Sequence, residues 1–177
     1  MNSSTKNILV SGASGIIGYG ILRSLAESPV RLNLIGTTIY TDSPAEYFCD
    51  VFEKAAPTSD DGYIDWLLSI IAKHDIDLII PGIEDDVYKW KDHLSEIKAS
   101  GVEVLLNNTS LISLCKDKWA FYEYIKANDS PYAIETSLDP EYDSLYEKFG
   151  APFLLKQRCG HGSKGIVIIT DRDMFGA

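Results

Sequence analysis

Short apolar runs alternate with helical segments through the first 106 residues, and this rhythm constrains the fold more than any other feature. The runs stand at residues 7–11, 31–36, 77–82 and 102–106. A short, mainly apolar run is typical of a parallel strand, because helices cover both faces of such a strand. The segments between the runs have helical spacing, and Pro29 and Gly101 provide stops. The sequence therefore predicts an α/β fold with a Rossmann-like, doubly wound parallel sheet.

Between the apolar runs of the first 106 residues, the sequence predicts helices from Ile17 to the stop at Pro29, at 63–71 and at 84–99, whereas the aromatic, turn-like segment 43–53 carries no firm assignment. The alternation of strands and helices changes after residue 106. Beyond residue 106 we expect helices at 110–114, 116–127 and 142–149, followed by strands at 153–156 and 166–170. The last two strands flank a nine-residue loop and read as an antiparallel hairpin. We place a boundary near residue 115, with a first domain at 1–115 and a second, α+β lobe at 116–177.

Charge and composition exclude several classes of function. The formal net charge is −10, which argues against nucleic acid or an anionic membrane as a partner. No apolar run reaches the roughly 18–20 residues of a membrane span, and no secretory signal opens the chain. The three cysteines and three histidines lack the spacing of a disulfide framework or zinc site, so we expect reduced thiols, no protein-bound zinc and a cytoplasmic location. Residues 150–177, however, hold four basic side chains against two acidic ones, which suits a small anion.

Gly12, Gly15 and Gly18 form a first glycine cluster, between the first strand and the first helix. Glycines there allow an anion or small substrate to approach the free N–H groups of the helix. The alternative is a tight turn that packs the helix against the sheet, and the motif alone does not decide between them. Asp42, 24 residues after Gly18, stands near where a ribose-binding acid would lie in a dinucleotide enzyme.

The pair Tyr122 and Lys126 supports the same dinucleotide alternative. Its YxxxK spacing is that of the catalytic pair of short-chain dehydrogenases, and a helix would place both side chains on one face. The NAD(P)-dependent oxidoreductase thus remains an alternative hypothesis. We favour the simpler interpretation that Tyr122 packs beside a solvated lysine, since the chain holds ten tyrosines.

The second glycine cluster is more informative. Lys156 ends an apolar strand, and the loop after it contains Arg158, Gly160, Gly162, Ser163, Lys164 and Gly165. Backbone N–H groups, a hydroxyl and a lysine on a mobile loop could fold over a polyphosphate. The alternative is an exposed hairpin loop that Ser and Lys keep soluble. This alternative does not explain why a charged residue, Lys156, stands at the end of an apolar strand.

Five pieces of the chain together resemble the ATP-grasp superfamily, and specifically proteins similar to the carbamoyl-phosphate synthase large chain. The pieces are residues 8–25, 41–57, 77–86, 115–118 and 153–166. The resemblance implies a pre-ATP-grasp domain followed by an ATP-grasp lobe that catalyses ATP-dependent carboxylate–amine ligation through an acylphosphate. By matching positions it implies that Lys118 and Lys156 contact the phosphates of ATP. It also implies that a lid covers these phosphates, formed by Gly160, Gly162, Ser163, Lys164 and Gly165.

The resemblance also implies parts that this sequence does not contain. The Mg²⁺ ligands, the adenine hinge and the last catalytic arginine of the family belong to the second half of its fold, so no catalytic or metal-binding residue is assigned here. We expect the chain, as a fragment or a natural truncation, to be inactive alone and to bind Mg-ATP weakly or not at all. The implied partners are a small carboxylate or bicarbonate and an amine, with a homodimer expected. A non-catalytic regulatory or assembly module is the third hypothesis.

Overall fold

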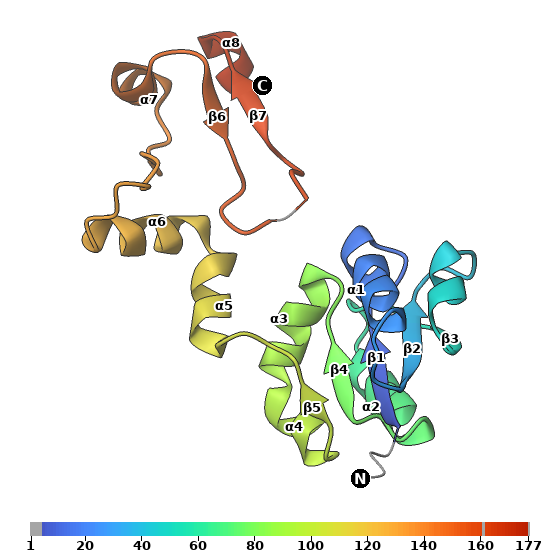
Figure 1. The fold of residues 1–177 in the computed structure, drawn as a ribbon. Helices are drawn as coiled ribbons and strands as arrows, with labels where there is room; N and C mark the ends of the chain where they lie inside the picture. The colour runs from blue at the N-terminus through green and yellow to red at the C-terminus, as the bar shows by residue number, and fades with distance from the viewer. Residues whose placement is uncertain (1–4, 161, 177) are drawn as a thin grey trace. The chain divides into compact units, whose positions relative to one another are not determined.

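The computed structural model describes residues 5–160 and 162–176, and the chain separates into two compact units, Met1–Thr109 and Ser110–Ala177 (Figure 1). The units divide at the first residue of helix α5 (Thr109–Lys116), whereas the predicted boundary lies near the last residue of that helix. Within the described residues no helix is long and apolar enough to cross a membrane.

The first unit is built on a parallel sheet of five strands in the order β3-β2-β1-β4-β5. Its strands are β1 (Lys6–Val10), β2 (Leu32–Thr38), β3 (Val51–Lys54), β4 (Leu78–Ile80) and β5 (Glu103–Val104). Its helices are α1 (Ile16–Ala26), the 3-10 helix η1 (Pro44–Phe48), α2 (Tyr63–Lys73), α3 (Glu84–Asp92) and α4 (Leu94–Ala99). The predicted α/β class with a doubly wound parallel sheet is confirmed.

Apolar side chains cover both faces of this sheet. On one face Val10, Leu34 and Ile80 pack with Leu22 of α1. The opposite face carries Leu9, Ile35 and Ile79, which pack with residues of α2 and α3, among them Tyr63, Leu67 and Trp90. Burial of successive side chains on opposite faces of the sheet explains why the central strands are mainly apolar.

A polar network lies buried beneath α3. The Asp86 carboxylate is 2% exposed and accepts hydrogen bonds from Thr58 Oγ1 and Tyr63 Oη, each at 2.7 Å. Trp90 Nε1 donates to Tyr63 Oη at 3.1 Å. Burial, reinforced by the charge of Asp86, raises the pKa of the Tyr63 phenol well above its ordinary value. This network fixes α2 and α3 against each other.

Two elements of the first unit differ from the expectation. Segment 43–53, for which no firm assignment is made from the sequence, contains η1 and most of the edge strand β3. Val51, Phe52 and Glu53 of β3 are half-buried and Lys54 is exposed, and Glu53 pairs with Lys73 and His74. The single helix expected at 84–99 is two helices that meet at His93. There the His93 N–H donates to Lys89 O, and its carbonyl accepts from Ile97 N, so one residue ends α3 and begins α4.

The second unit contains the helices α5, α6 (Lys118–Ala127) and α7 (Tyr142–Phe149) and the short helix α8 (Arg172–Phe175). Strands β6 (Phe153–Leu155) and β7 (Val167–Ile169) pair antiparallel, as predicted. Its small core is formed by Leu145, Phe153 and Ile169, with Tyr142 and Phe175 packed around them. One face of the β6–β7 hairpin therefore packs against side chains of α7 and α8.

Candidate functional site

The loop between β6 and β7, here called the glycine loop (residues 157–165), has an unusual backbone. Gly162, Ser163 and Gly165 adopt φ angles of +63°, +58° and +70°. Such angles cost an L-residue roughly 1–2 kcal/mol, whereas glycine adopts them freely. His161 lies outside the described residues. The loop shape thus depends on glycine at two of the predicted lid positions.

Gln157 organises the inside of this loop. A Cβ atom at Gly160 would lie 2.8 Å from Gln157 Oε1, and one at Gly165 would lie 2.9 Å from Gln157 Cδ. The two limbs of the loop therefore close on the Gln157 side chain, and glycine at 160 and 165 leaves room for it. Sequence reasoning missed Gln157, because nothing in a lone glutamine between charged residues indicates packing.

Lys118 reaches the glycine loop from the start of α6. Its Nζ donates to Gly160 O at 2.7 Å, and its backbone N donates to Arg158 O at 3.1 Å. Lys118 and the glycine loop, which the resemblance implies both contact the phosphates of ATP, thus lie in direct contact although 42 residues separate the hydrogen-bonded pair. An ammonium group beside a glycine loop can neutralise the charge of a bound phosphate.

Asp117 and Arg158 join the same two segments by an ion pair. Arg158 Nε donates to both carboxylate oxygens of Asp117, at 2.7 and 2.8 Å, and Nη2 lies 2.7 Å from Oδ2. Asp117 is also the N-cap of α6, since Oδ1 accepts from the N–H groups of Trp119 and Ala120. The Arg158 guanidinium, helped by these N–H groups, lowers the pKa of Asp117 to about 2. The helix predicted at 116–127 includes Asp117, so sequence reasoning missed both its role as the cap and its arginine partner.

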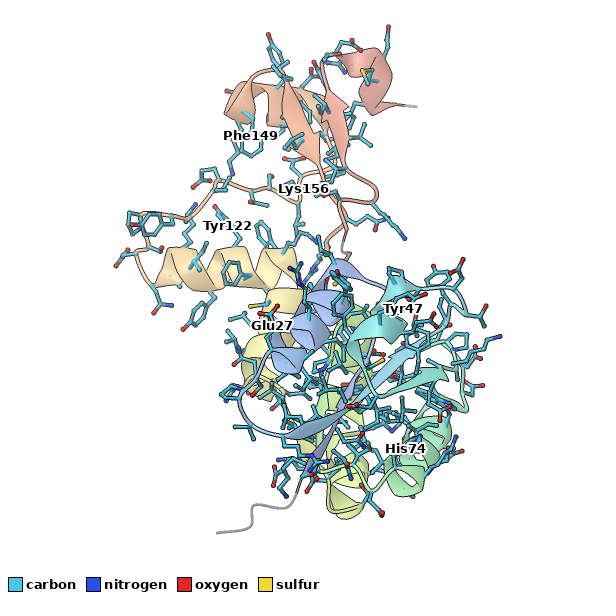
Figure 2. The ribbon with its side chains drawn as sticks, turned by 45° about the vertical axis from the view of Figure 1, so that its right-hand side comes forward. Glu27, Tyr47, His74, Tyr122, Phe149 and Lys156 are labelled. Carbon is cyan, nitrogen blue, oxygen red and sulfur yellow. The ribbon has the colours of Figure 1, made fainter. Side chains whose placement is uncertain are left out.

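Lys156 lies where β6 enters the glycine loop (Figure 2). Side chains alternate along a strand, so Lys156 shares a face with Leu154, while Phe153 and Leu155 pack into the core of the unit. Leu154 is 53% exposed and Ile168, paired with it across the hairpin, is 56% exposed. Lys156 and Lys164 are also exposed. The outer face of the hairpin is therefore an apolar strip with a lysine at its loop end.

The first glycine cluster serves packing in the first unit. A Cβ atom at Gly18 would lie 2.4 Å from Gly12 O, and one at Gly82 would lie 2.8 Å from Gly18 Cα. Gly12 has φ +58°, and its carbonyl accepts from Gly15 N at 2.8 Å. These contacts explain why glycine occupies positions 12 and 18, because α1 approaches the strand ends too closely to leave room for a side chain. Gly15 lies in the turn between them. An anion site at Gly12, Gly15 and Gly18 remains a prediction, and Asp42 is exposed in the segment after β2.

The structure brings Tyr122 and Lys126 together on one face of α6, as their spacing predicted. Lys126 Nζ donates to Tyr122 Oη at 2.7 Å, but Glu135 accepts from both groups, at 2.8 Å from Lys126 and 3.0 Å from Tyr122. Lys126 lowers the pKa of Glu135 to about 2. Tyr122 is 6% exposed and packs against Trp119. The pair therefore has the features of a packing residue beside a neutralised lysine.

A shallow cavity of about 580 Å³ lies beside α6, and sequence reasoning missed it; it is lined in part by Lys126, which donates to Glu135. Lys148 of α7 lines it and approaches Glu135 Oε2 at 3.4 Å. The cavity is thus bordered by two lysines, Lys126 and Lys148, that both lie within ion-pair distance of Glu135, and by Glu123. In residues 5–160 and 162–176, no three His, Cys, Asp or Glu side chains gather closely enough to hold a metal ion.

Comparison with known protein families gives one match, over the first unit. Residues 21–105 match the family model described as "PylC-like, N-terminal domain". No curated protein matches the chain. The carbamoyl-phosphate synthase-like assignment stays a prediction, because the matching family model and solved structures carry other names.

Several solved structures share the fold at low sequence identity. N5-carboxyaminoimidazole synthetase from Staphylococcus aureus, complexed with ADP, is 19% identical with a TM-score of 0.67, over 98% of this chain and 44% of that one. The biotin carboxylase domain dimer of the Hydrogenobacter thermophilus 2-oxoglutarate carboxylase, in complex with MgADP, ADP and bicarbonate, is 19% identical with a TM-score of 0.72, over 99% and 40%. Biotin carboxylase from Campylobacter jejuni is 18% identical with a TM-score of 0.72, over 97% of this chain and 40% of that one. This chain therefore spans less than half the length of these neighbours.

Proposed function

We propose that this chain is the N-terminal portion of an ATP-grasp ligase and that its second unit binds the nucleotide. The observation that carries the proposal is the hydrogen bond between Lys118 Nζ and Gly160 O, which joins a helix-start lysine to the glycine loop. A cation held at a glycine-rich backbone is suited to phosphate recognition. The fold shared with the ADP-bound neighbours supports the same ligand.

The chemistry of the hairpin fits the remaining parts of a nucleotide. Lys156 would contact the phosphates as a second point charge, and Gly162, Ser163, Lys164 and Gly165 would cover them with backbone N–H groups, a hydroxyl and an ammonium. The strip of Leu154 and Ile168 next to Lys156 offers an apolar surface for a purine ring. One face of the hairpin would then bind both ends of ATP.

The proposed reaction is ATP-dependent ligation of a carboxylate and an amine. A carboxylate oxygen attacks the γ-phosphorus, ADP leaves, and the acylphosphate is then captured by the amine with release of phosphate. Lys118 and Lys156 would assist by positioning and by neutralising charge on the transferring group. The described residues offer no acidic cluster for Mg²⁺, so no step is assigned to that ion here. Carbamoyl-phosphate synthase-like substrates, bicarbonate and an amine, rest on the sequence resemblance alone.

The dehydrogenase alternative is not favoured. Glu135 binds the Tyr122 hydroxyl and the Lys126 ammonium, and neither group contacts the glycine loop in the described structure. The neighbours reported above are synthetases and carboxylases rather than dehydrogenases.

The test measures ADP affinity and ATP turnover in the natural protein that contains this sequence. Lys156→Ala should weaken ADP binding by tenfold or more and reduce turnover, because a charged contact to phosphate is lost. Lys98→Ala, which removes an exposed lysine of α4, is the matched control and should change neither quantity. Unchanged ADP affinity in Lys156→Ala, or tight NADH binding without ATP binding, would contradict the proposal.

A further inference from the structure

The two limbs of the glycine loop are held very differently. The first limb, residues 158–160, contacts α6 through the Arg158 side chain, the Arg158 carbonyl and the Gly160 carbonyl. For the second limb, residues 162–165, the described structure shows no hydrogen bond or ion pair to α6. Among the described residues, the hydrogen bonds and the ion pair that join the first limb to the start of α6 all end on Asp117 or Lys118.

Asp117 is a fixed point for the loop, because the start of α6 holds its carboxylate in place. It accepts from two backbone N–H groups of the first turn, at 3.0 and 3.3 Å. Its negative charge is also favoured at a helix N-terminus. The three short contacts from Arg158 therefore fix the direction of the arginine and, through it, the path of the chain before Gly160. A planar guanidinium is suited to this paired contact, and an ammonium is not.

The Lys118 backbone provides a second link and a specific reporter. The N–H of the first helical residue has no acceptor inside its own helix. Here Arg158 O accepts it at 3.1 Å. Protection of the Lys118 amide from hydrogen exchange therefore depends on the glycine loop and not on the rest of α6.

We propose that Arg158 is a positioning residue whose ion pair with Asp117 holds the first limb of the glycine loop over Lys118, in place for a nucleotide. The nucleotide part of this proposal rests on the proposed function, whereas the anchoring part does not. A glycine-rich segment loses much conformational entropy when it is ordered, so a loop that is ordered in advance binds its ligand more tightly. The second limb packs on the Gln157 side chain and has no such link to α6 in the described structure, so it can adjust to the phosphates independently of the anchor.

Amide exchange followed by NMR on the 177-residue chain tests the anchor. Arg158→Ala should speed exchange of the Lys118 amide about fivefold or more, and Arg158→Lys should give an intermediate rate. Asp117→Asn should behave like Arg158→Ala while α6 stays helical by circular dichroism, since asparagine is a good N-cap. Arg172→Ala removes another exposed Arg–Asp pair of the same unit, with Asp143, and should leave the rate unchanged. Unchanged Lys118 exchange in both Arg158→Ala and Asp117→Asn would overturn the proposal.

The consequence for binding is measured separately as MgADP affinity of the natural protein. Arg158→Ala should weaken it about three- to tenfold, with partial rescue by Arg158→Lys. If Lys156→Ala weakens MgADP binding and Arg158→Ala does not, positioning by Arg158 is wrong. If the wild type fails to bind MgADP, the proposed function fails, and the exchange measurement still decides whether the anchor exists.

Discussion

The two glycine clusters of this chain use the same residue for different physical reasons. In the first unit, Cβ atoms at Gly18 and Gly82 would meet backbone atoms at 2.4 Å and 2.1 Å. In the glycine loop, the atoms nearest to Cβ atoms at Gly160 and Gly165 would all belong to the Gln157 side chain, and Gly162 has no described atom within 4 Å of such a Cβ. Backbone cannot give way, whereas a flexible side chain can. The first cluster is therefore required for folding, and the second for the shape and freedom of a loop.

The largest effect is expected from Gly18→Ala. The new methyl group would overlap Gly12 O, so α1 must move away from the sheet, and we expect a loss of about 3 kcal/mol or more in the free energy of unfolding. Gly20→Ala is the matched control two residues along α1, where no described atom lies within 4 Å of a Cβ. It should stabilise the chain by about 0.5–1 kcal/mol, since alanine favours a helix. Urea unfolding measures both changes, and equal effects would contradict the packing role of the first cluster.

A smaller effect is expected from Gly162→Ala in the glycine loop. Space is available, so the cost comes only from φ +63° and should be roughly 1–2 kcal/mol in the local stability of the second unit. The free energy of unfolding of the first unit should not change. Hydrogen exchange in β6 and β7 measures the effect, and a loss as large as that of Gly18→Ala would mean that the loop is packed as tightly as the first cluster.

The elements of the chain also differ in how far their structure can be predicted from the sequence. Central strands such as β1 and β4 are buried on both faces, so their composition alone identifies them. The edge strand β3 has only Val51 and Phe52 as apolar residues, and pairing with β2 decides its structure. The break at His93 has no proline or glycine to signal it. Contacts such as Arg158–Asp117 depend on how the hairpin meets α6, which local patterns do not encode.

The Asp117–Arg158 pair also makes a prediction about pH. The pKa of Asp117 is lowered to about 2 from an ordinary value of 3.8, so the ion pair stabilises the folded loop fully above about pH 4 and is lost as pH falls through about 2. Carbon chemical shifts of the carboxyl group should show the Asp117 pKa rising toward its ordinary value in Arg158→Ala. Glu135 is a control within the same unit, because Lys126 and Tyr122 lower its pKa to about 2 and Arg158 is not among the causes. A rise in both pKa values would mean that the variant disturbs the whole unit.

The smallest effect is expected from Tyr122→Phe, which distinguishes packing from catalysis. The ring keeps its contact with Trp119, and only the hydroxyl is lost, so the free energy of unfolding should fall by about 0.5–1 kcal/mol. ATP turnover of the natural protein should be unchanged, because the described structure places neither Tyr122 nor Lys126 in contact with the glycine loop. A proton-transferring tyrosine would instead lose orders of magnitude in rate with the same small change in stability. The ratio of these two measurements, rather than either alone, therefore decides whether α6 contributes a scaffold for Lys118 or a second reactive centre.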